Sequence, residues 1–211
     1  MRGRRLDARE DAAGAIDVAA TEILGGAVVA YPTETYYALG ADPRNGQALE
    51  RVLKLKGRTR DKPLLLIADS VEMVERWSAA TPASLRMVAE AFWPGPLTVV
   101  LRAPPGLAPA ITSDQQTIAL RVSSHPLARA LVERCQVPLT GTSANRSGES
   151  PPTTVSQVEA ALGHALAAVL DCGGTAGGAA STLLDLTTEP YRILRPGAVS
   201  VAQIAEAMRL V

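Results

Sequence analysis

Aromatic residues, histidine and cysteine are all scarce in this chain. Only seven of its 211 residues are Phe, Trp or Tyr, so a base-stacking platform for single-stranded nucleic acid would have almost no aromatic side chains to use. The two cysteines, Cys135 and Cys172, stand far apart without a CxxC pair, and His125 and His164 are the only histidines. These counts exclude a disulfide framework and a zinc site of standard spacing, and they favour a reducing, cytoplasmic compartment.

Long apolar runs and a net charge are missing as well. No apolar run approaches the ~18–20 residues of a membrane span, and no apolar core follows the basic segment 1–10, so we expect neither a membrane anchor nor an export signal. Basic and acidic residues number 21 each, which gives a formal net charge of zero. With 47% apolar and 20% charged residues, the composition predicts one compact globular domain and excludes disorder and collagen.

The few lysines are unevenly placed. All three (Lys54, Lys56 and Lys62) fall within nine residues that also contain Arg58 and Arg60. Such a run attracts anions, although a solvated helix end explains a charge run of this kind about equally well.

Apolar periodicity and capping residues predict alternating helices and strands. The spacing predicts a helix over residues 7–24 that ends at Gly25-Gly26, a helix over 46–55 capped by Asn45, and one over 126–134. Ser70 and Thr81-Pro82 are typical helix starts, and capping boxes open the last two helices. Expected strands cover residues 27–31, 63–68, 97–102, 117–122, 138–140, 167–171, 182–186 and 191–194. This mixture predicts a single α/β domain built on a mixed sheet.

Two polar segments follow expected strand ends, where α/β folds carry their ligands. They are residues 33–36, after Pro32, and residues 141–148. The glycine-rich segment 172–180 is more typical of a turn than of an anion-binding nest.

The familiar catalytic and nucleotide motifs are absent. The sequence GTSAN at 141–145 has Asn where a nucleophile elbow needs its second glycine, and a triad of Ser143 with His125 is disfavoured. Neither GxxxxGK[ST] nor GxGxxG occurs. A nucleotide would therefore be bound by hydroxyls, an amide and glycine-rich backbone, with positive charge from Lys56, Arg58, Arg121 and Arg195.

Seven short motifs in a fixed order carry a resemblance to a known family. They are YPTETYYALG (31–40), LKGR with KPL (55–58, 62–64), WPGPLT (93–98), LRV with HP (120–122, 125–126), TSANRSG (142–148), STLLD (181–185) and LRPG (194–197). Together they resemble the YrdC-like threonylcarbamoyl-AMP synthase family over residues 16–198. The length is similar to that of the single-domain form, so we expect one domain across residues 1–211.

The resemblance implies a twisted mixed β-sheet with helices around a positively charged concave cleft. It also implies a nucleotidyltransferase that makes L-threonylcarbamoyladenylate and pyrophosphate from ATP, L-threonine and bicarbonate, as L-threonylcarbamoyladenylate synthase does, for N6-threonylcarbamoyladenosine modification of tRNA. Mg²⁺ would arrive with ATP, without metal ligands from the protein, and the product would pass to a tRNA threonylcarbamoyl-transferase complex, with weak RNA binding as a further expectation.

The family's site residues map onto two groups here. The expected ATP-binding residues are Lys56, Arg58, Lys62, Thr117, Ser143, Asn145 and Arg195, of which Lys56 and Arg58 would also be catalytic. The expected threonine-binding residues are Thr33, Thr35, Arg121 and Ser181.

Four positions depart from the family's pattern. Ala38 replaces the usual Gly after Tyr37, Lys62 stands where many relatives have Asn, Ile67 stands where a His often helps to hold the amino acid, and Ser150-Pro151 reverses the usual Pro-Ser order. The alternative hypothesis is a non-catalytic RNA-binding module that uses the same basic cleft. The number of arginines favours that alternative, whereas the neutral net charge and the few aromatics oppose it.

Overall fold

In the computed structural model, which describes residues 3–58 and 63–209, the strands form two sheets. The five-stranded sheet has the order β1 (Arg4–Asp7), β9 (Ala168–Asp171), β2 (Val29–Pro32), β3 (Tyr37–Gly40), β8 (Thr142–Ser143). The six-stranded sheet has the order β11 (Arg192–Arg195), β10 (Thr182–Asp185), β5 (Leu97–Arg102), β6 (Thr117–Val122), β4 (Leu66–Ala68), β7 (Leu139–Thr140). Both sheets mix parallel and antiparallel pairs. The α/β class is confirmed, but the expectation of one sheet is wrong.

The chain passes from one sheet to the other at Gly141. This residue alone separates β7 from β8, and its amide N–H donates to the carbonyl oxygen of Leu65 at 2.9 Å. A Cβ atom at this position would lie 2.6 Å from Cγ1 of Ile67 and 2.7 Å from Cδ1 of Leu65. A larger residue would therefore displace the side chains of Ile67 and Leu65. The crossing brings the loop after β8 to the place where the two sheets meet.

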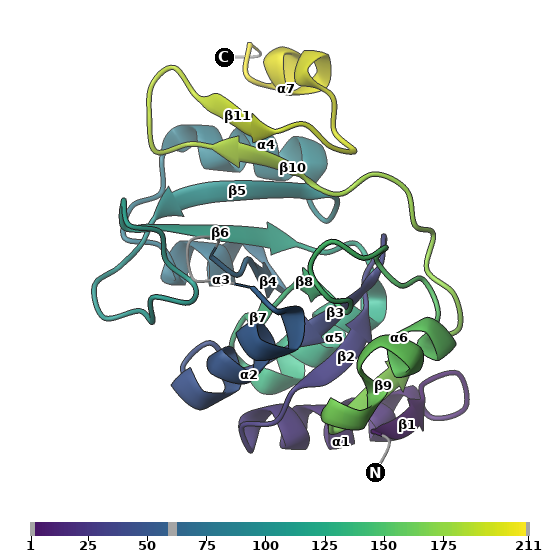
Figure 1. Cartoon of the computed structure of the whole chain (residues 1–211). Coiled ribbons are helices and arrows are strands. Elements are labelled where there is room, and N and C mark those ends of the chain that lie inside the picture. The colour runs from purple at the N-terminus through teal and green to yellow at the C-terminus, as the bar shows by residue number, and fades with distance from the viewer. Residues whose placement is uncertain (1–2, 59–62, 210–211) are drawn as a thin grey trace.

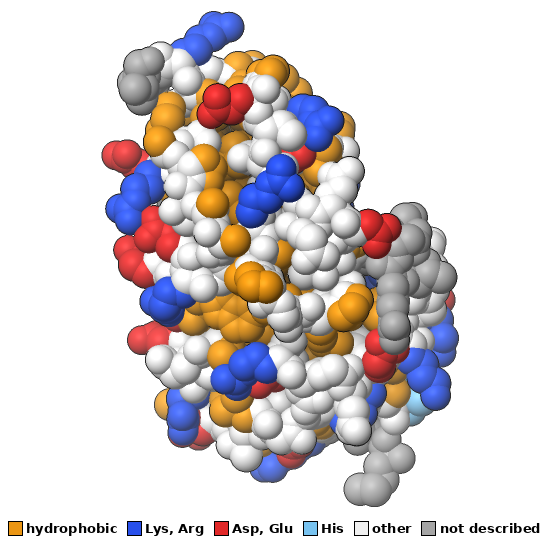
Figure 2. All heavy atoms as spheres, turned by 90° about the vertical axis from the view of Figure 1, so that its left-hand side faces the viewer, with side chains coloured by type: hydrophobic (Ala, Val, Ile, Leu, Met, Phe, Trp, Pro, Cys, Tyr) orange, Lys and Arg blue, Asp and Glu red, His pale blue; other side chains and the backbone are white. Residues whose placement is uncertain are grey.

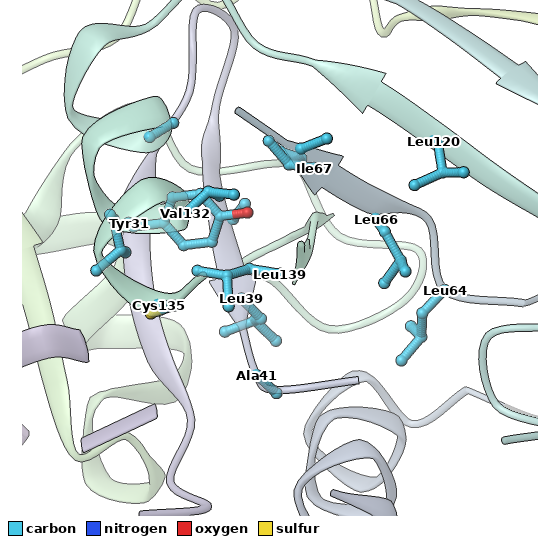
Figure 3. Packing of buried hydrophobic residues seen from close by; sticks show 14 of the residues in the cluster. Tyr31, Leu39, Ala41, Leu64, Leu66, Ile67, Leu120, Val132, Cys135 and Leu139 are labelled. Carbon is cyan, nitrogen blue, oxygen red and sulfur yellow. The ribbon is translucent and has the colours of Figure 1, made fainter. Parts of the chain in front are cut away.

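The two sheets share one hydrophobic core. Figure 3 shows Tyr31 and Leu39 of the five-stranded sheet beside Leu139 and Ile67 of the other, and all four residues are fully buried. The hydroxyl of Tyr31 donates to the backbone oxygen of Thr140 at 2.9 Å, so the polar group of this buried ring is satisfied. Continuous apolar packing fixes the relative position of the sheets and of the loops between them.

Helices pack around the two sheets (Figure 1). They are α1 (Ala12–Leu24), α2 (Gly46–Lys56), α3 (Val71–Arg76), α4 (Ala83–Phe92), α5 (Pro126–Cys135), α6 (Val155–Leu162), the short 3₁₀ helix η1 (Gly163–Ala165) and α7 (Val201–Ala207). The predicted caps of α2 and α3 by Asn45 and Ser70 are confirmed, as are the capping boxes of Thr154 with Gln157 and of Ser200 with Gln203. None of the helices in the described ranges is sufficiently long and apolar to cross a membrane.

The N-terminal segment differs from its prediction. Residues 7–24 were expected to form one helix, but Arg4–Asp7 is strand β1, which runs parallel to β9. Helix α1 begins only after Asp11, whose side chain accepts a hydrogen bond from the amide of Gly14 at 2.9 Å. The segment joins the sheet because Leu6 is buried there opposite Leu170, a gain that the local periodicity does not reveal.

Candidate active site

Helix α2 brings Lys56, and Arg58 just beyond its end, to the junction of the sheets. Leu49, Val52 and Leu53 anchor its buried face. The helix ends at Gly57, which adopts a left-handed conformation with φ of 59°, and Lys56 is therefore its last residue. The partial negative charge of a helix C-terminus favours a cation at this position.

The ammonium group of Lys56 is buried among neutral oxygens. Its Nζ donates to the backbone oxygen of Ser143 at 2.7 Å and contacts Oγ of Ser143 at 3.3 Å and Oδ1 of Asn145 at 3.1 Å. The residue is 4% exposed, and burial, helped by the charge of Arg58, lowers the pKa of Lys56 to about 8. A buried ammonium that contacts only neutral groups favours an anionic ligand.

The loop after β8 wraps around this end of α2. The side-chain amide of Asn145 donates to the backbone oxygens of Arg146 at 2.8 Å and Glu149 at 2.7 Å. The backbone N–H of Ser147 donates to the carbonyl oxygen of Lys56 at 2.8 Å. Asn145 thus orders the loop and holds the lysine at the same time.

A second buried cation lies on β6. Nη1 of Arg121 donates to Oε1 of Glu34, and the two side chains are 5% and 14% exposed. The other oxygen of Glu34 accepts a hydrogen bond from the hydroxyl of Ser123. Nε of Arg121 is buried and has no hydrogen-bond partner among the described residues.

Ser181 and Arg195 form a third part of the site. Nη2 of Arg195 donates to the backbone oxygen of Ser181 at 2.7 Å and contacts its Oγ at 3.2 Å. The hydroxyls of Ser181 and Thr98 lie 2.8 Å apart. Burial, followed by repulsion from Arg121, lowers the pKa of Arg195.

The polar run after β2 is tied to the glycine-rich segment 172–180. Oγ1 of Thr33 donates to the backbone oxygen of Tyr36 at 2.7 Å and lies 3.3 Å from Oγ1 of Thr35. The amide of Gly177 donates to the carbonyl oxygen of Thr35 at 2.7 Å. The hydroxyl of Tyr37 donates to the carbonyl oxygen of Gly173 at 2.8 Å. The segment therefore forms part of the structure around the site.

Nine of the eleven predicted site residues line one cavity of about 580 Å³, a size typical of small-molecule sites. These nine are Thr33, Thr35, Lys56, Arg58, Arg121, Ser143, Asn145, Ser181 and Arg195. Of the other two, Lys62 lies outside the described residues. Thr117 is not part of the lining: it lies four residues before Arg121 on β6, about 13 Å along a strand, and its hydroxyl pairs with that of Ser113 at 2.6 Å.

The departures from the family pattern differ in their position. Ala38 and Pro151 line the cavity, whereas Ile67 does not and is fully buried in the core. Sequence reasoning gave no role to Glu34, Ser123 or Glu149. A signal for Glu34 was present, because an arginine in a buried strand needs a counter-charge and Glu34 stands between two threonines of the candidate site.

The metal-binding capacity of the site is small. Within residues 3–58 and 63–209, no three His, Cys, Asp or Glu side chains gather in a way that could hold a metal ion. Glu149 is the one carboxylate among the described residues that line the cavity. A divalent cation would therefore depend mainly on its ligands from a nucleotide and water.

Fold and site together define an α/β protein whose two sheets meet at a polar cavity rich in cations. The family model Sua5/YciO/YrdC, described as "Telomere recombination", matches residues 21–197. The chain therefore belongs to this family, as its seven motifs indicated.

Individual relatives agree with this membership. The chain is 37% identical to the threonylcarbamoyl-AMP synthase of Pyrococcus abyssi, over 92% of this chain and 57% of the relative. It is 36% identical to the threonylcarbamoyl-AMP synthase of Bacillus subtilis, over 84% and 51%. A crystal structure of P. abyssi Sua5 complexed with L-threonine superimposes with a TM-score of 0.91 at 35% identity, covering 99% of this chain and 61% of that one. The chain thus spans little more than half the length of these relatives.

Proposed function

We propose that this protein synthesises L-threonylcarbamoyladenylate and pyrophosphate from ATP, L-threonine and bicarbonate, and so acts as a nucleotidyltransferase. The observation that carries the proposal is one cavity in which Lys56, Ser143 and Asn145 lie together with Arg121, Thr35 and Ser181. The first three suit a phosphate chain, and the others suit an amino acid with a carboxylate and a hydroxyl. The names of the relatives and the threonine complex of P. abyssi Sua5 support the same reaction.

Charge in the cavity supports the nucleotide part of the proposal. The described lining includes Lys56, Arg58, Arg121 and Arg195 but only one carboxylate, that of Glu149. Arg121 is already paired with Glu34. Lys56 contacts neutral oxygens in the described structure, and its charge suits the triphosphate of ATP, the most negatively charged substrate of the reaction.

The reaction needs positioning and charge stabilisation rather than a protein nucleophile. The amine of threonine forms a carbamate with carbon dioxide, losing a proton, or with bicarbonate, losing water. A carbamate oxygen then attacks the α-phosphorus of ATP. A P–O bond forms to the carbamate as the bond to pyrophosphate breaks, and pyrophosphate leaves with that electron pair. Lys56 and Arg58 would stabilise the charge on the phosphate oxygens, while Arg121 would hold the threonine carboxylate.

Magnesium would enter with ATP and neutralise part of its phosphate charge. The scarcity of carboxylates in the described lining fits such a nucleotide-borne ion. The product would be transferred to tRNA by a separate threonylcarbamoyl-transferase complex in the cytoplasm.

The RNA-binding alternative has weaker support. On the face that Figure 2 shows, Lys and Arg side chains alternate with Asp and Glu side chains and do not form a single basic surface. This face therefore offers no continuous basic path for RNA, and the zero net charge and seven aromatic residues of the whole chain also oppose the alternative.

One assay distinguishes the two functions. The protein is incubated with ATP, magnesium, threonine and labelled bicarbonate, and the mixture is analysed by mass for a labelled adenylate. Threonine-dependent adenylate and pyrophosphate are the expected products. RNA binding with a steep salt dependence, in the absence of any adenylate, would overturn the proposal in favour of the alternative.

A further inference from the structure

Glu34 has both of its carboxylate oxygens engaged beside Arg121, a residue that lines the cavity. Oε1 accepts a hydrogen bond from Nη1 of Arg121 and Oε2 accepts one from Oγ of Ser123. Ser123 is itself fully buried, and its Oγ accepts the backbone N–H of His125 at 3.2 Å. Because Ser123 holds the carboxylate independently of Arg121, Glu34 is a fixed anchor for the guanidinium group.

This contact uses one side of the guanidinium group and leaves Nε, on another side, without a hydrogen-bond partner among the described residues. A guanidinium can bind a carboxylate through the edge formed by Nε and Nη2, and Glu34 takes Nη1, which lies outside that edge. Nε of Arg121 is buried without a hydrogen-bond partner in the part of the chain that the structure describes. A buried N–H without a partner is unfavourable, so this edge is suited to an acceptor that comes from a ligand.

Arg121 also needs Glu34 for electrostatic reasons. Arg195 is close enough that the charge of Arg121 contributes to lowering the pKa of Arg195. Arg121 itself is almost fully buried. Without a negative partner, repulsion from Arg195 and the cost of burial would both favour a different orientation of the Arg121 side chain.

We propose that Glu34 is a positioning residue, which holds Arg121 through Nη1 so that its Nε edge receives the carboxylate of the amino-acid substrate. The inference rests on the proposed function, because that function supplies the amino acid. The opposite hypothesis is that Glu34 competes with the substrate for Arg121. The two hypotheses predict opposite changes in threonine affinity when Glu34 is replaced. Loss of a positioning group weakens substrate binding, whereas loss of a competitor strengthens it.

The variant Glu34→Gln tests this difference. Glutamine keeps the size and one acceptor oxygen but removes the charge that orients Arg121. We expect the KM for threonine to rise about tenfold or more, and the KM for ATP to stay within about twofold. The matched control is Glu22→Gln on the exposed face of α1, which should change neither constant.

A substrate without a carboxylate separates positioning from a general structural effect. L-Threoninamide cannot pair with Arg121, so the wild-type protein should prefer threonine to the amide in kcat/KM. In Glu34→Gln this preference should fall toward that of Arg121→Gln, whereas a structural defect would reduce the use of both substrates equally. Ser123→Ala, which removes the second contact of Glu34, should shift the preference in the same direction by a smaller factor.

Calorimetric titration with threonine makes the outcome independent of turnover. If the wild type binds threonine but forms no adenylate, the proposed function fails while the Glu34 inference is still decided by the threonine affinity of the variants. If the wild type is active and Glu34→Gln shows an unchanged or lower KM for threonine, or an unchanged preference over the amide, the inference is overturned. If Glu34→Gln does not fold, Ser123→Ala decides by the same measures. Failure of the wild type to bind threonine would overturn both.

Discussion

Nζ of Lys56 lies 3.1 Å from Oδ1 of Asn145, a residue 89 positions later in the chain. This contact joins the C-terminus of α2 to the loop after β8 and places a cation, an amide and the Ser143 hydroxyl in one small volume. In the proposed reaction, the same group would bind the phosphates of ATP.

The first prediction concerns the charge of Lys56. Lys56→Met should weaken transition-state binding by about 2–4 kcal/mol, because it removes a charge-assisted contact to phosphate. Thermal stability should change little, because the relief from burying an ammonium group offsets the loss of its contacts with Ser143 and Asn145. The control is Lys54→Met, two residues earlier at an exposed position of α2. Wild-type turnover in Lys56→Met would exclude a phosphate-binding role.

The second prediction is a pH dependence of ATP affinity. The pKa of Lys56 in the free protein is lowered by burial to about 8, so the group loses its proton as pH rises through that value. Because ATP binds the protonated form, affinity should fall from about pH 7 to pH 9, by up to about tenfold per pH unit above the pKa. Titration calorimetry at constant ionic strength measures this slope. Lys56→Met should show a flatter profile, and parallel profiles would contradict the assignment.

The third prediction concerns the amide of Asn145. Its donor bonds hold the backbone oxygens of Arg146 and Glu149, so Asn145→Ala should lower the free energy of unfolding by about 1–3 kcal/mol. ATP affinity should fall as well, because Lys56 loses one of its oxygen contacts. Denaturant unfolding and ATP titration of the same preparation separate the two effects. An unchanged unfolding midpoint would show that the amide does not order the loop.

The fourth prediction tests the crossing between the sheets. Gly141→Ala places a Cβ atom 2.6 Å from Ile67 and 2.7 Å from Leu65, which should cost about 1–3 kcal/mol of stability. Gly46→Ala is the control: no atom lies within 4 Å of a Cβ built there, and alanine suits a helix. Melting temperatures of both variants suffice. If Gly141→Ala melts like the wild type, the crossing does not depend on glycine.

The fifth prediction concerns substrate choice. If a hydroxyl of Thr33, Thr35 or Ser181 bonds the side-chain OH of threonine, serine should be a poor substrate and 2-aminobutyrate a poorer one. Serine loses only a methyl contact, whereas 2-aminobutyrate leaves buried polar groups without a partner. Competition of the three amino acids in adenylate formation checks this order. Equal use of threonine and 2-aminobutyrate would show that the hydroxyl is not recognised.

Local signals in the sequence were sufficient to predict many of the helices and strands of this protein. Strands Leu97–Arg102 and Thr117–Val122 have the bounds that their apolar patterns predict, and Asn45 caps α2 as expected. Caps and apolar runs depend on neighbouring residues, so they can be read without knowledge of the fold. The order of the seven motifs likewise indicated the family and nine residues that meet at one cavity.

Tertiary structure alone decided the features that depend on distant partners. The separation into two sheets and the short strands β1 and β8 follow from long-range pairing. The pairing of Glu34 with Arg121 joins residues 87 positions apart, and the pKa of Lys56 is lowered by burial. A sequence pattern records neither which charges meet nor how much water they lose. The folded core determines both the pairing of charged groups and their loss of hydration, and these decide which polar residues form a site.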